Sequence, residues 1–281
     1  MHNILSIYFG ASIPLMWASI RGLFSERSGV TNIGLEGAMT LGAFIGALVF
    51  QGSESLLWGF TAVILTGMVM GSLMSLLVER GTIRALLVGL ALNLSITSGV
   101  GLALKGFFPG KWFFSVPPVP MTDMNLSWLL FVLGLLLILA YHQVLYRLKM
   151  GAEILATGDN VELAGMHGCP TSRIRTLSLM FGCAAAGIGG FFLPLSVGQF
   201  TSRDMVAGRG YMALLLVIAS GWRPLSVLLW SSLLGILWSW RDLSPKTSGP
   251  AQFFEAAPWI VLLAFVLAKR TFHPPRELDV T

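Results

Sequence analysis

The sequence predicts an all-α protein, a polytopic membrane helix bundle of about nine transmembrane or partly inserted helices that form one domain over residues 1–281. Hydrophobic residues make up 55% of the chain and charged residues 11%, whereas about a quarter of the residues in a soluble domain are charged. The apolar residues gather in nine runs, and Lys and Arg stand mostly at the ends of these runs. This pattern is typical of an integral membrane protein.

The apolar runs define the expected helices. A helix needs roughly 20 apolar residues to cross the hydrocarbon core, and shorter segments are tolerated where they line a protein cavity. The runs are Ile4–Phe24, Ile33–Phe50, Leu56–Val78, Leu86–Leu104, Leu126–Tyr146, Thr176–Leu195, Tyr211–Ser220, Leu225–Trp240 and Phe253–Ala268. The seventh is too short to span alone, so it begins near Val206 or is only half inserted. The first lacks a basic flank and a cleavage site, so we expect a retained span.

The basic residues predict the orientation of the chain, because cytoplasmic helix ends carry the excess of Lys and Arg. Of the 18 basic residues, 12 fall on one side, Arg21 among them, and six on the other. This distribution places the N-terminus outside and the C-terminus in the cytoplasm. The polar segment 147–175 is then cytoplasmic.

Small residues recur at four-residue spacing in three of the runs. Such stripes let helix backbones approach closely in lipid, so we interpret them as helix contacts. The stripes are Ala38, Gly42 and Gly46; Gly67, Gly71 and Ser75; and Gly182, Ala186 and Gly190.

An ionisable residue, Glu36, stands near the head of an apolar run that continues to Phe50. If residues 32–40 are helical, Asn32, Glu36 and Thr40 lie on one face. A carboxylate in hydrocarbon is costly, and its usual role is to line a polar pathway. The alternative is that Glu36 caps or hydrogen-bonds a neighbouring helix without touching solute.

Two further features are candidates for the same pathway. Asn93 and Thr97 form an i, i+4 pair in the fourth run, where either an interhelical hydrogen bond or a pathway role fits. The stretch Arg203–Tyr211, which includes Arg209, precedes the short seventh run, and a helix N-terminus there would attract electronegative groups. The aromatic loop Lys105–Phe114 fits an interfacial belt or a recognition surface.

The cytoplasmic segment contains a predicted short helix. Asp159 or Asn160 can cap it, and Gly168 can end it. A helix of about two turns is not stable alone, so we expect it to dock against a partner.

The sequence also argues against several classes of site. It contains no G-x-x-x-x-G-K-[ST] phosphate-binding motif. The four His residues lie far apart, so no metal site and no cofactor site is predicted, and no Ser, His and Asp group with catalytic spacing is present. Cys169 and Cys183 are expected to be unpaired. The basic residues form no patch for nucleic acid.

Five sequence elements together resemble the permease subunits of ATP-binding-cassette (ABC) importers, in the nucleoside-type branch of the superfamily with the ribose and branched-chain amino acid permeases. The family patterns are GLFSERSGVxNIGLEG, VGxALNL, a loosely matched GENxxAAxxxGI, AGRGxxALxxVIxGxWxP and a proline in the final span. They correspond here to Gly22–Gly37, Val88–Leu94, Gly158–Gly168, Ala207–Pro224 and Pro258. The chain departs from the family at Glu153 and Leu155, where arginines are common, and at Asp159, which replaces Glu.

The resemblance implies a type II importer permease in the inner membrane of a bacterium. The chain would form half of a translocation path with a second, non-identical permease, and a solute-binding protein or lipoprotein would deliver a small molecule. Two separate ATPase subunits would hold ATP and Mg. The short cytoplasmic helix would couple to the ATPase through Gly158, Asp159, Asn160, Glu162, Leu163, Ala164 and Gly165.

The cargo stays open between three classes at this point. The resemblance favours a nucleoside, and riboflavin or a simple sugar are alternatives. From a different functional class, an ion-coupled secondary transporter also uses broken helices and intramembrane carboxylates. An intramembrane enzyme is a more distant possibility, since no nucleophile and base can be paired.

Overall fold

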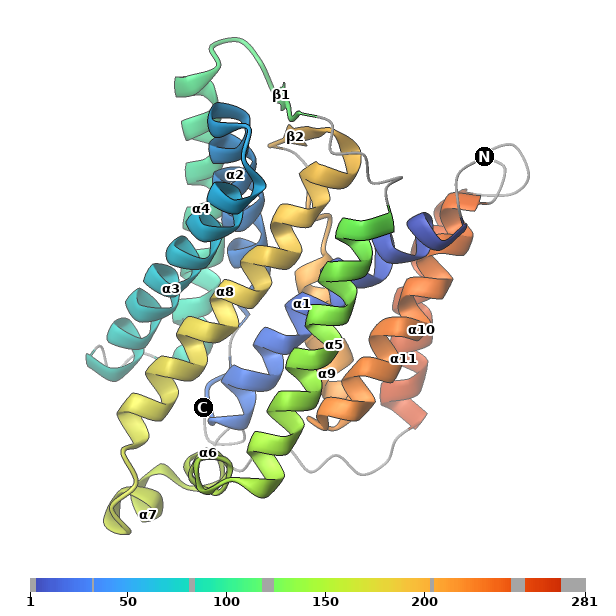
Figure 1. The fold of residues 1–281 in the computed structure, drawn as a ribbon. Helices are drawn as coiled ribbons and strands as arrows, with labels where there is room; N and C mark the ends of the chain where they lie inside the picture. The colour runs from blue at the N-terminus through green and yellow to red at the C-terminus, as the bar shows by residue number, and fades with distance from the viewer. Residues whose placement is uncertain are drawn as a thin grey trace.

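The structure is a computed structural model that describes residues 4–31, 33–80, 84–117, 124–202, 205–243 and 251–268. These residues form eleven helices and two short strands (Figure 1). In chain order they are α1 Ile4–Arg27, α2 Leu35–Ser53, α3 Leu56–Arg80, α4 Ala85–Phe107, β1 Phe113–Ser115, α5 Met124–Arg147, α6 Lys149–Asp159, α7 Val161–Met166, α8 Thr171–Val197, β2 Gln199–Thr201, α9 Arg209–Ser220, α10 Pro224–Leu243 and α11 Ala251–Ala268.

The helix bundle is organised around α8, which packs against α1, α2 and α3. Close approach depends on the predicted small-residue stripes. A Cβ atom on Gly67 of α3 would lie 2.6 Å from the Cα of Ala184 in α8, and one on Gly42 of α2 would overlap the backbone of Gly187. The prediction that these stripes are helix contacts is therefore confirmed.

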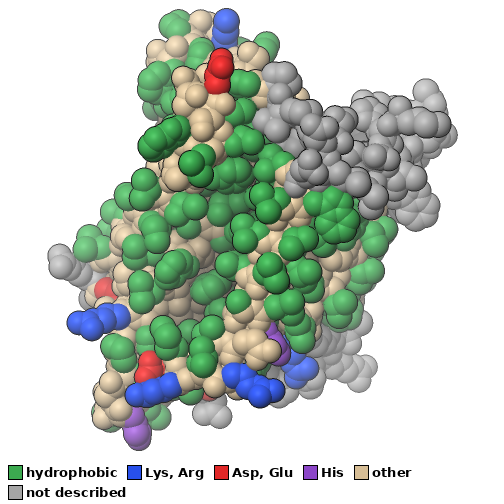
Figure 2. Space-filling view, in the orientation of Figure 1, with side chains coloured by type: hydrophobic (Ala, Val, Ile, Leu, Met, Phe, Trp, Pro, Cys, Tyr) green, Lys and Arg blue, Asp and Glu red, His purple; other side chains and the backbone are tan. Residues whose placement is uncertain are grey.

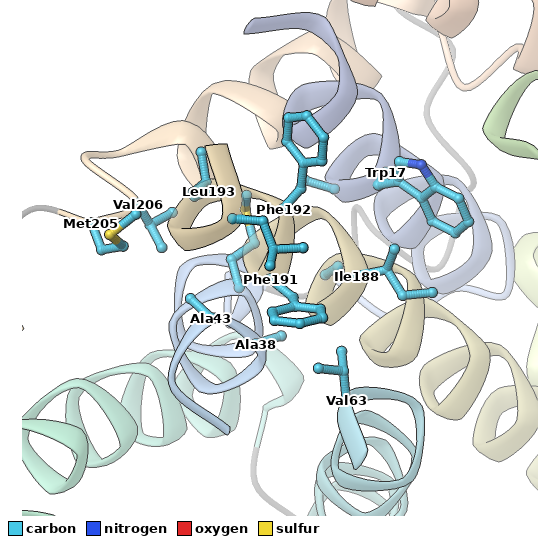
Figure 3. Packing of buried hydrophobic residues seen from close by; sticks show 14 of the residues in the cluster. Trp17, Ala38, Ala43, Val63, Ile188, Phe191, Phe192, Leu193, Met205 and Val206 are labelled. Atoms are coloured by element: carbon cyan, nitrogen blue, oxygen red, sulfur yellow. The ribbon is translucent and has the colours of Figure 1, made fainter. Parts of the chain in front are cut away.

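Aromatic side chains fill the space beside these backbone contacts. Phe191 of α8 is fully buried and packs edge-on against Phe60 at 5.0 Å between ring centroids. Its ring lies near Ala38 of α2 and Val63 of α3 (Figure 3). Helix α8 thus combines close backbone contacts at its small residues with a large buried ring, Phe191, that fills the space beside them. Such close packing is typical of a protein interior.

The outer surface of the bundle is apolar. Figure 2 shows hydrophobic side chains over the middle of one face, with most of the visible Lys and Arg side chains toward its lower edge. Exposed leucines occur along several helices, among them Leu65, Leu94, Leu102, Leu129, Leu136, Leu229 and Leu263. Five described helices, α2, α3, α4, α5 and α8, are long and apolar enough to cross a membrane. The protein is therefore a multi-pass membrane protein.

The helix predictions hold with three differences. Each of the nine apolar runs corresponds to a helix, although α2 begins at Leu35 and not at Ile33. The number of nine crossings stays a prediction, because α1 is not among the five candidate spans and α9 to α11 supply only short apolar segments among the described residues. The sequence analysis missed α6 and the two strands. Residues Phe113–Ser115 and Gln199–Thr201 pair antiparallel at the end of the bundle opposite to α6 and α7 (Figure 1).

Candidate functional site

The carboxylate of Glu36 caps the N-terminus of α9. Its Oε1 accepts a hydrogen bond from the amide of Gly208 at 2.8 Å, and its Oε2 accepts one from the amide of Gly210 at 2.8 Å. The first amides of a helix lack partners within the helix, and a negative charge beside them is favourable. Both carboxylate oxygens are therefore engaged in the arrangement that the sequence analysis gave as the alternative to a pathway role.

Two glycines make this cap possible. Gly208 has a φ of 78°, in the left-handed region that glycine adopts without strain. A Cβ atom on Gly210 would lie 2.6 Å from the backbone nitrogen of Glu36 and 2.7 Å from its Oε2. Any side chain at position 210 would separate α9 from α2.

The predicted stripe of Asn32, Glu36 and Thr40 required a helix over residues 32–40, and this requirement is not met. The helix begins at Leu35, and Ile33 and Gly34 precede it in non-helical backbone. Asn32 lies outside the described residues. Thr40 is in the helix, but its hydroxyl donates to the carbonyl of Glu36 at 2.8 Å and so satisfies its own helix.

Asn93 joins α4 to the same site. Its Nδ2 donates to the hydroxyl of Tyr211 in the first turn of α9, and its side chain is buried. Its Oδ1 is also buried and accepts no hydrogen bond from any residue that the structure describes. A Cβ atom on Gly37 would lie 3.1 Å from that oxygen. The contact makes Asn93 part of the α2, α4 and α9 junction.

Thr97 and Arg209 make their own hydrogen bonds beside this group. Thr97 is exposed, and its hydroxyl donates to the carbonyl of Asn93 at 2.8 Å. Arg209 turns back to the loop before α9, where Nη1 donates to the carbonyl of Val206 at 3.1 Å. Its guanidinium also lies 4.9 Å from the ring centroid of Trp238 in α10.

Arg21 supports the site from α1. The sequence analysis counts it among the basic helix ends, but the structure buries it completely, and its Nη1 donates to the carbonyl of Gly34. Gly34 is the residue that precedes α2. A buried cation therefore holds the start of the helix that carries Glu36.

The predicted short cytoplasmic helix is present as α7, at the end of the bundle away from the two strands (Figure 1). Asn160 caps it, since its Oδ1 accepts a hydrogen bond from the amide of Leu163 at 2.9 Å. The helix ends at Met166, and Gly168 follows with a φ of 81°. Of the two capping residues that the sequence allowed, Asn160 is used, and Asp159 ends the preceding helix α6.

The residues predicted to couple to an ATPase divide into two groups. Ala164 is buried toward the bundle, and Gly158 packs against the backbone of Arg27. The remaining five, Asp159, Asn160, Glu162, Leu163 and Gly165, are exposed. Met166 does not belong to the predicted coupling set, but it is 80% exposed on the same short helix as Leu163, which is 53% exposed. The outer surface of α7 is thus apolar with acidic neighbours.

Comparison with known proteins identifies the family. The model of the family described as branched-chain amino acid transport system / permease component matches residues 4–267. The chain belongs to this permease family. Membership in a family of ABC transporter permeases removes the alternatives of an ion-coupled secondary transporter and an intramembrane enzyme. The permease has a transport role and works with ATPase and substrate-binding partners.

Three characterised or named relatives align with most of the permease. It is 30% identical over 253 residues to a putative glucose ABC transporter permease protein, TsgC13, of Haloferax volcanii. This alignment covers 84% of this chain and 75% of the relative. It is 27% identical to the nucleoside ABC transporter permease protein NupC of Lactococcus lactis, with 92% and 90% covered. It is 29% identical to the guanosine ABC transporter permease protein NupQ of Bacillus subtilis, with 80% and 79% covered. No solved structure matches the permease.

The site contains contacts that a sequence pattern cannot supply. Tyr211 and Gly210 were recognised only as members of a family motif, and their partners Asn93 and Glu36 lie more than a hundred residues away in the chain. The motif itself was the available signal, because a glycine-rich stretch before a helix marks a close backbone approach. It does not say which residue approaches.

Proposed function

We propose that this permease forms half of the import path for a nucleoside, in a complex with a second, non-identical permease, two ATPase subunits that hold ATP and Mg, and an extracytoplasmic solute-binding protein or lipoprotein. The observation that supports a nucleoside as the cargo is the alignment with the nucleoside permease NupC over 92% of this chain. The putative glucose relative keeps a simple sugar as the second candidate. Riboflavin has no support among these relatives.

The geometry of α9 supports a path beside Glu36. Twelve helical residues extend about 18 Å, which is well short of the roughly 30 Å hydrocarbon core. The C-terminal end of α9 contacts the C-terminal end of α1, because Arg27 donates to the carbonyl of Trp222. The N-terminus of α9 and the Glu36 carboxylate would then lie inside the membrane. A helix end at this depth is a recurrent feature of solute sites in transporters.

The path would be lined by Glu36, Asn93 and Tyr211, with Thr97 on the exposed side of α4. The buried Oδ1 of Asn93 supplies a hydrogen-bond acceptor to a polar solute. Such contacts need only be weak, since a path must release what it binds. Arg209 and Thr40 lie next to this lining, and Asn32, outside the described residues, stays a predicted path residue.

The exposed surface of α7 would contact the ATPase in the cytoplasm, with the N-terminus of the chain outside and the C-terminus inside. The excess of basic residues near α5 to α8 supports this orientation. The exposed Leu163 and Met166 provide an apolar contact of the kind found at the centre of interfaces. Coupled closure of the ATPases would then move this helix as a rigid body.

Uptake measurements test the cargo. We expect proteoliposomes that contain the complete transporter to accumulate labelled uridine or guanosine with ATP and solute-binding protein. Glucose and riboflavin serve as competing solutes in the same assay. Accumulation of glucose without nucleoside would transfer the proposal to sugars. ATP-independent uptake by the chain alone would contradict the importer proposal.

Charge reversal tests the contact of α7 with the ATPase. We expect Asp159→Lys with Glu162→Lys to reduce uptake and solute-stimulated ATP hydrolysis about tenfold, because like charges brought together at an interface cost several kcal/mol. Membrane insertion should not change, since both residues are exposed. Glu54→Lys, at the exposed end of α2, is the matched control. Unchanged uptake in the double variant would remove the coupling role.

A further inference from the structure

The last residues of α1 and the turn that follows them, residues Ser25–Val30, contact both the coupling segment and α9. We refer to these six residues as the turn. It is built as a compact helix end, in which the amide of Val30 donates to the carbonyl of Ser25 at 3.0 Å and the amide of Gly29 donates to the carbonyl of Glu26 at 3.0 Å. Gly29 has the left-handed φ of 79° that this type of helix end requires. Ser25, Glu26, Ser28 and Val30 are all buried. The turn is therefore a compact unit fixed by backbone hydrogen bonds and burial.

Both helices that flank α7 are attached to this turn. Gly158, near the end of α6, packs so closely that a Cβ atom on it would overlap the carbonyl oxygen of Arg27 and lie 3.4 Å from the amide nitrogen of Gly29. From α8, the Nε of Arg175 donates to the carbonyl of Ser28 at 3.3 Å, and its Nη2 donates to the carbonyl of Gly29 at 3.5 Å. The two helices that flank α7 in the chain therefore contact the turn through Gly158 and through Arg175.

The same turn is hydrogen-bonded to the residue that follows the C-terminal end of α9. The Nε of Arg27 donates to the carbonyl of Trp222 at 2.8 Å, and the indole Nε1 of Trp222 donates to Oε2 of Glu26. Trp222 has a φ of 55°, which is unusual for a residue with a side chain, and it is 5% exposed. Strain of this kind persists only where surrounding contacts determine the conformation. Trp222 is thus fixed by two adjacent residues of the turn.

Helix α9 is held along its length and at its other end by the same part of the chain. A Cβ atom on Gly22 of α1 would lie 2.8 Å from Cγ2 of Val217, so α1 and α9 are in direct contact. Glu36 caps the N-terminus through Gly208 and Gly210. Both ends of α9 are consequently bound to residues between positions 26 and 36.

We propose that the Ser25–Val30 turn transmits the movement of the coupling segment to α9, with Trp222 as the positioning residue that joins them. The proposal rests on the proposed importer function. When the ATPase displaces α7, the shifts of Gly158 and Arg175 move the turn, and the turn carries α9 through Glu26, Arg27 and Trp222. The Glu36 cap at the far end of α9 then moves relative to α4, which changes the opening beside Asn93.

Trp222→Phe tests this role in the complete, reconstituted transporter. The substitution keeps an aromatic ring in the same place and removes the donor to Glu26. We expect the amount of solute imported per ATP hydrolysed to fall about tenfold, as the loss of a buried hydrogen bond that leaves its partner unsatisfied would produce. ATP hydrolysis and recovery of the complex should stay near those of the unmodified protein. Trp58→Phe, at a 63% exposed position of α3, is the matched control.

A second variant approaches the turn from the other side. Gly158→Ala places a methyl group against the carbonyl of Arg27 and should lower the same ratio of import to hydrolysis. Because both variants interrupt one route, the double variant should be little worse than either single variant. An additive loss in the double variant would overturn the shared route.

The outcomes separate the relay from a merely structural role. A structural role would lower import, hydrolysis and the yield of complex in proportion, and an unchanged ratio in Trp222→Phe would overturn the relay. Failure of the unmodified complex to import any of the tested solutes would instead overturn the proposed function.

Discussion

Gly42→Ala is expected to abolish the native packing of the bundle. The added methyl group would overlap the backbone of Gly187 in α8, and backbone cannot move aside as a flexible side chain can. Overpacking of a protein core costs about 1–3 kcal/mol and occasionally more, and a methyl group that meets backbone atoms belongs at the upper end. The midpoint of thermal unfolding in detergent, followed by the loss of monodisperse protein, should fall by several degrees or the protein should fail to accumulate.

Gly52→Ala is the control for this experiment. It lies in the same helix, α2, but a Cβ atom there would meet no atom within 4 Å. Alanine is the better helix former, so this variant should be at least as stable as the unmodified protein. Equal unfolding midpoints for the two variants would contradict the packing described for α2 and α8.

Glu36→Gln is expected to weaken the start of α9 and to reduce import. The amide of glutamine offers one acceptor oxygen in place of two, so its NH₂ group would face the amide of Gly208 or Gly210. A buried N–H group that is left without its hydrogen-bond acceptor costs about 1–3 kcal/mol of stability. We expect uptake to fall about tenfold to hundredfold if α9 must hold this position, since each 1.4 kcal/mol is a factor of ten.

Amide hydrogen exchange reports on this variant independently of transport. The backbone amide of Gly208 or of Gly210 should exchange faster in Glu36→Gln, because one of the two acceptor oxygens is lost. Glu54→Gln makes the same change at the exposed end of α2 and should alter neither exchange nor uptake. Normal exchange together with normal uptake in Glu36→Gln would show that the cap is dispensable.

The two roles considered for Glu36 are compatible in this geometry. The capping hydrogen bonds use both carboxylate oxygens, so in the proposed import path the residue would act by fixing α9. Asn93 and Tyr211 then present the polar atoms nearest to that helix end. A solute that competes for the Tyr211 hydroxyl or the Asn93 amide would need to displace only one hydrogen bond.

The short helix α7 shows how far local sequence signals reach. A capping residue followed by a few helical residues and a glycine predicts a helix and its two ends, because capping depends on atoms within five residues. Asn160 and Gly168 take these roles in the structure. The same signals could not indicate that Gly158, just before this helix, meets the turn after α1.

The sequence by itself determined the membrane class, the position of the apolar helices and the use of small-residue stripes as contacts, because hydropathy and helical period are properties of neighbouring residues. Only the tertiary structure decided the partners of the site. Glu36 meets Gly208 across 172 residues, and Arg27 meets Trp222 across 195. Such pairs form when the whole bundle packs around α8. The position of a carboxylate in an apolar run does not indicate which helix end will lie beside it.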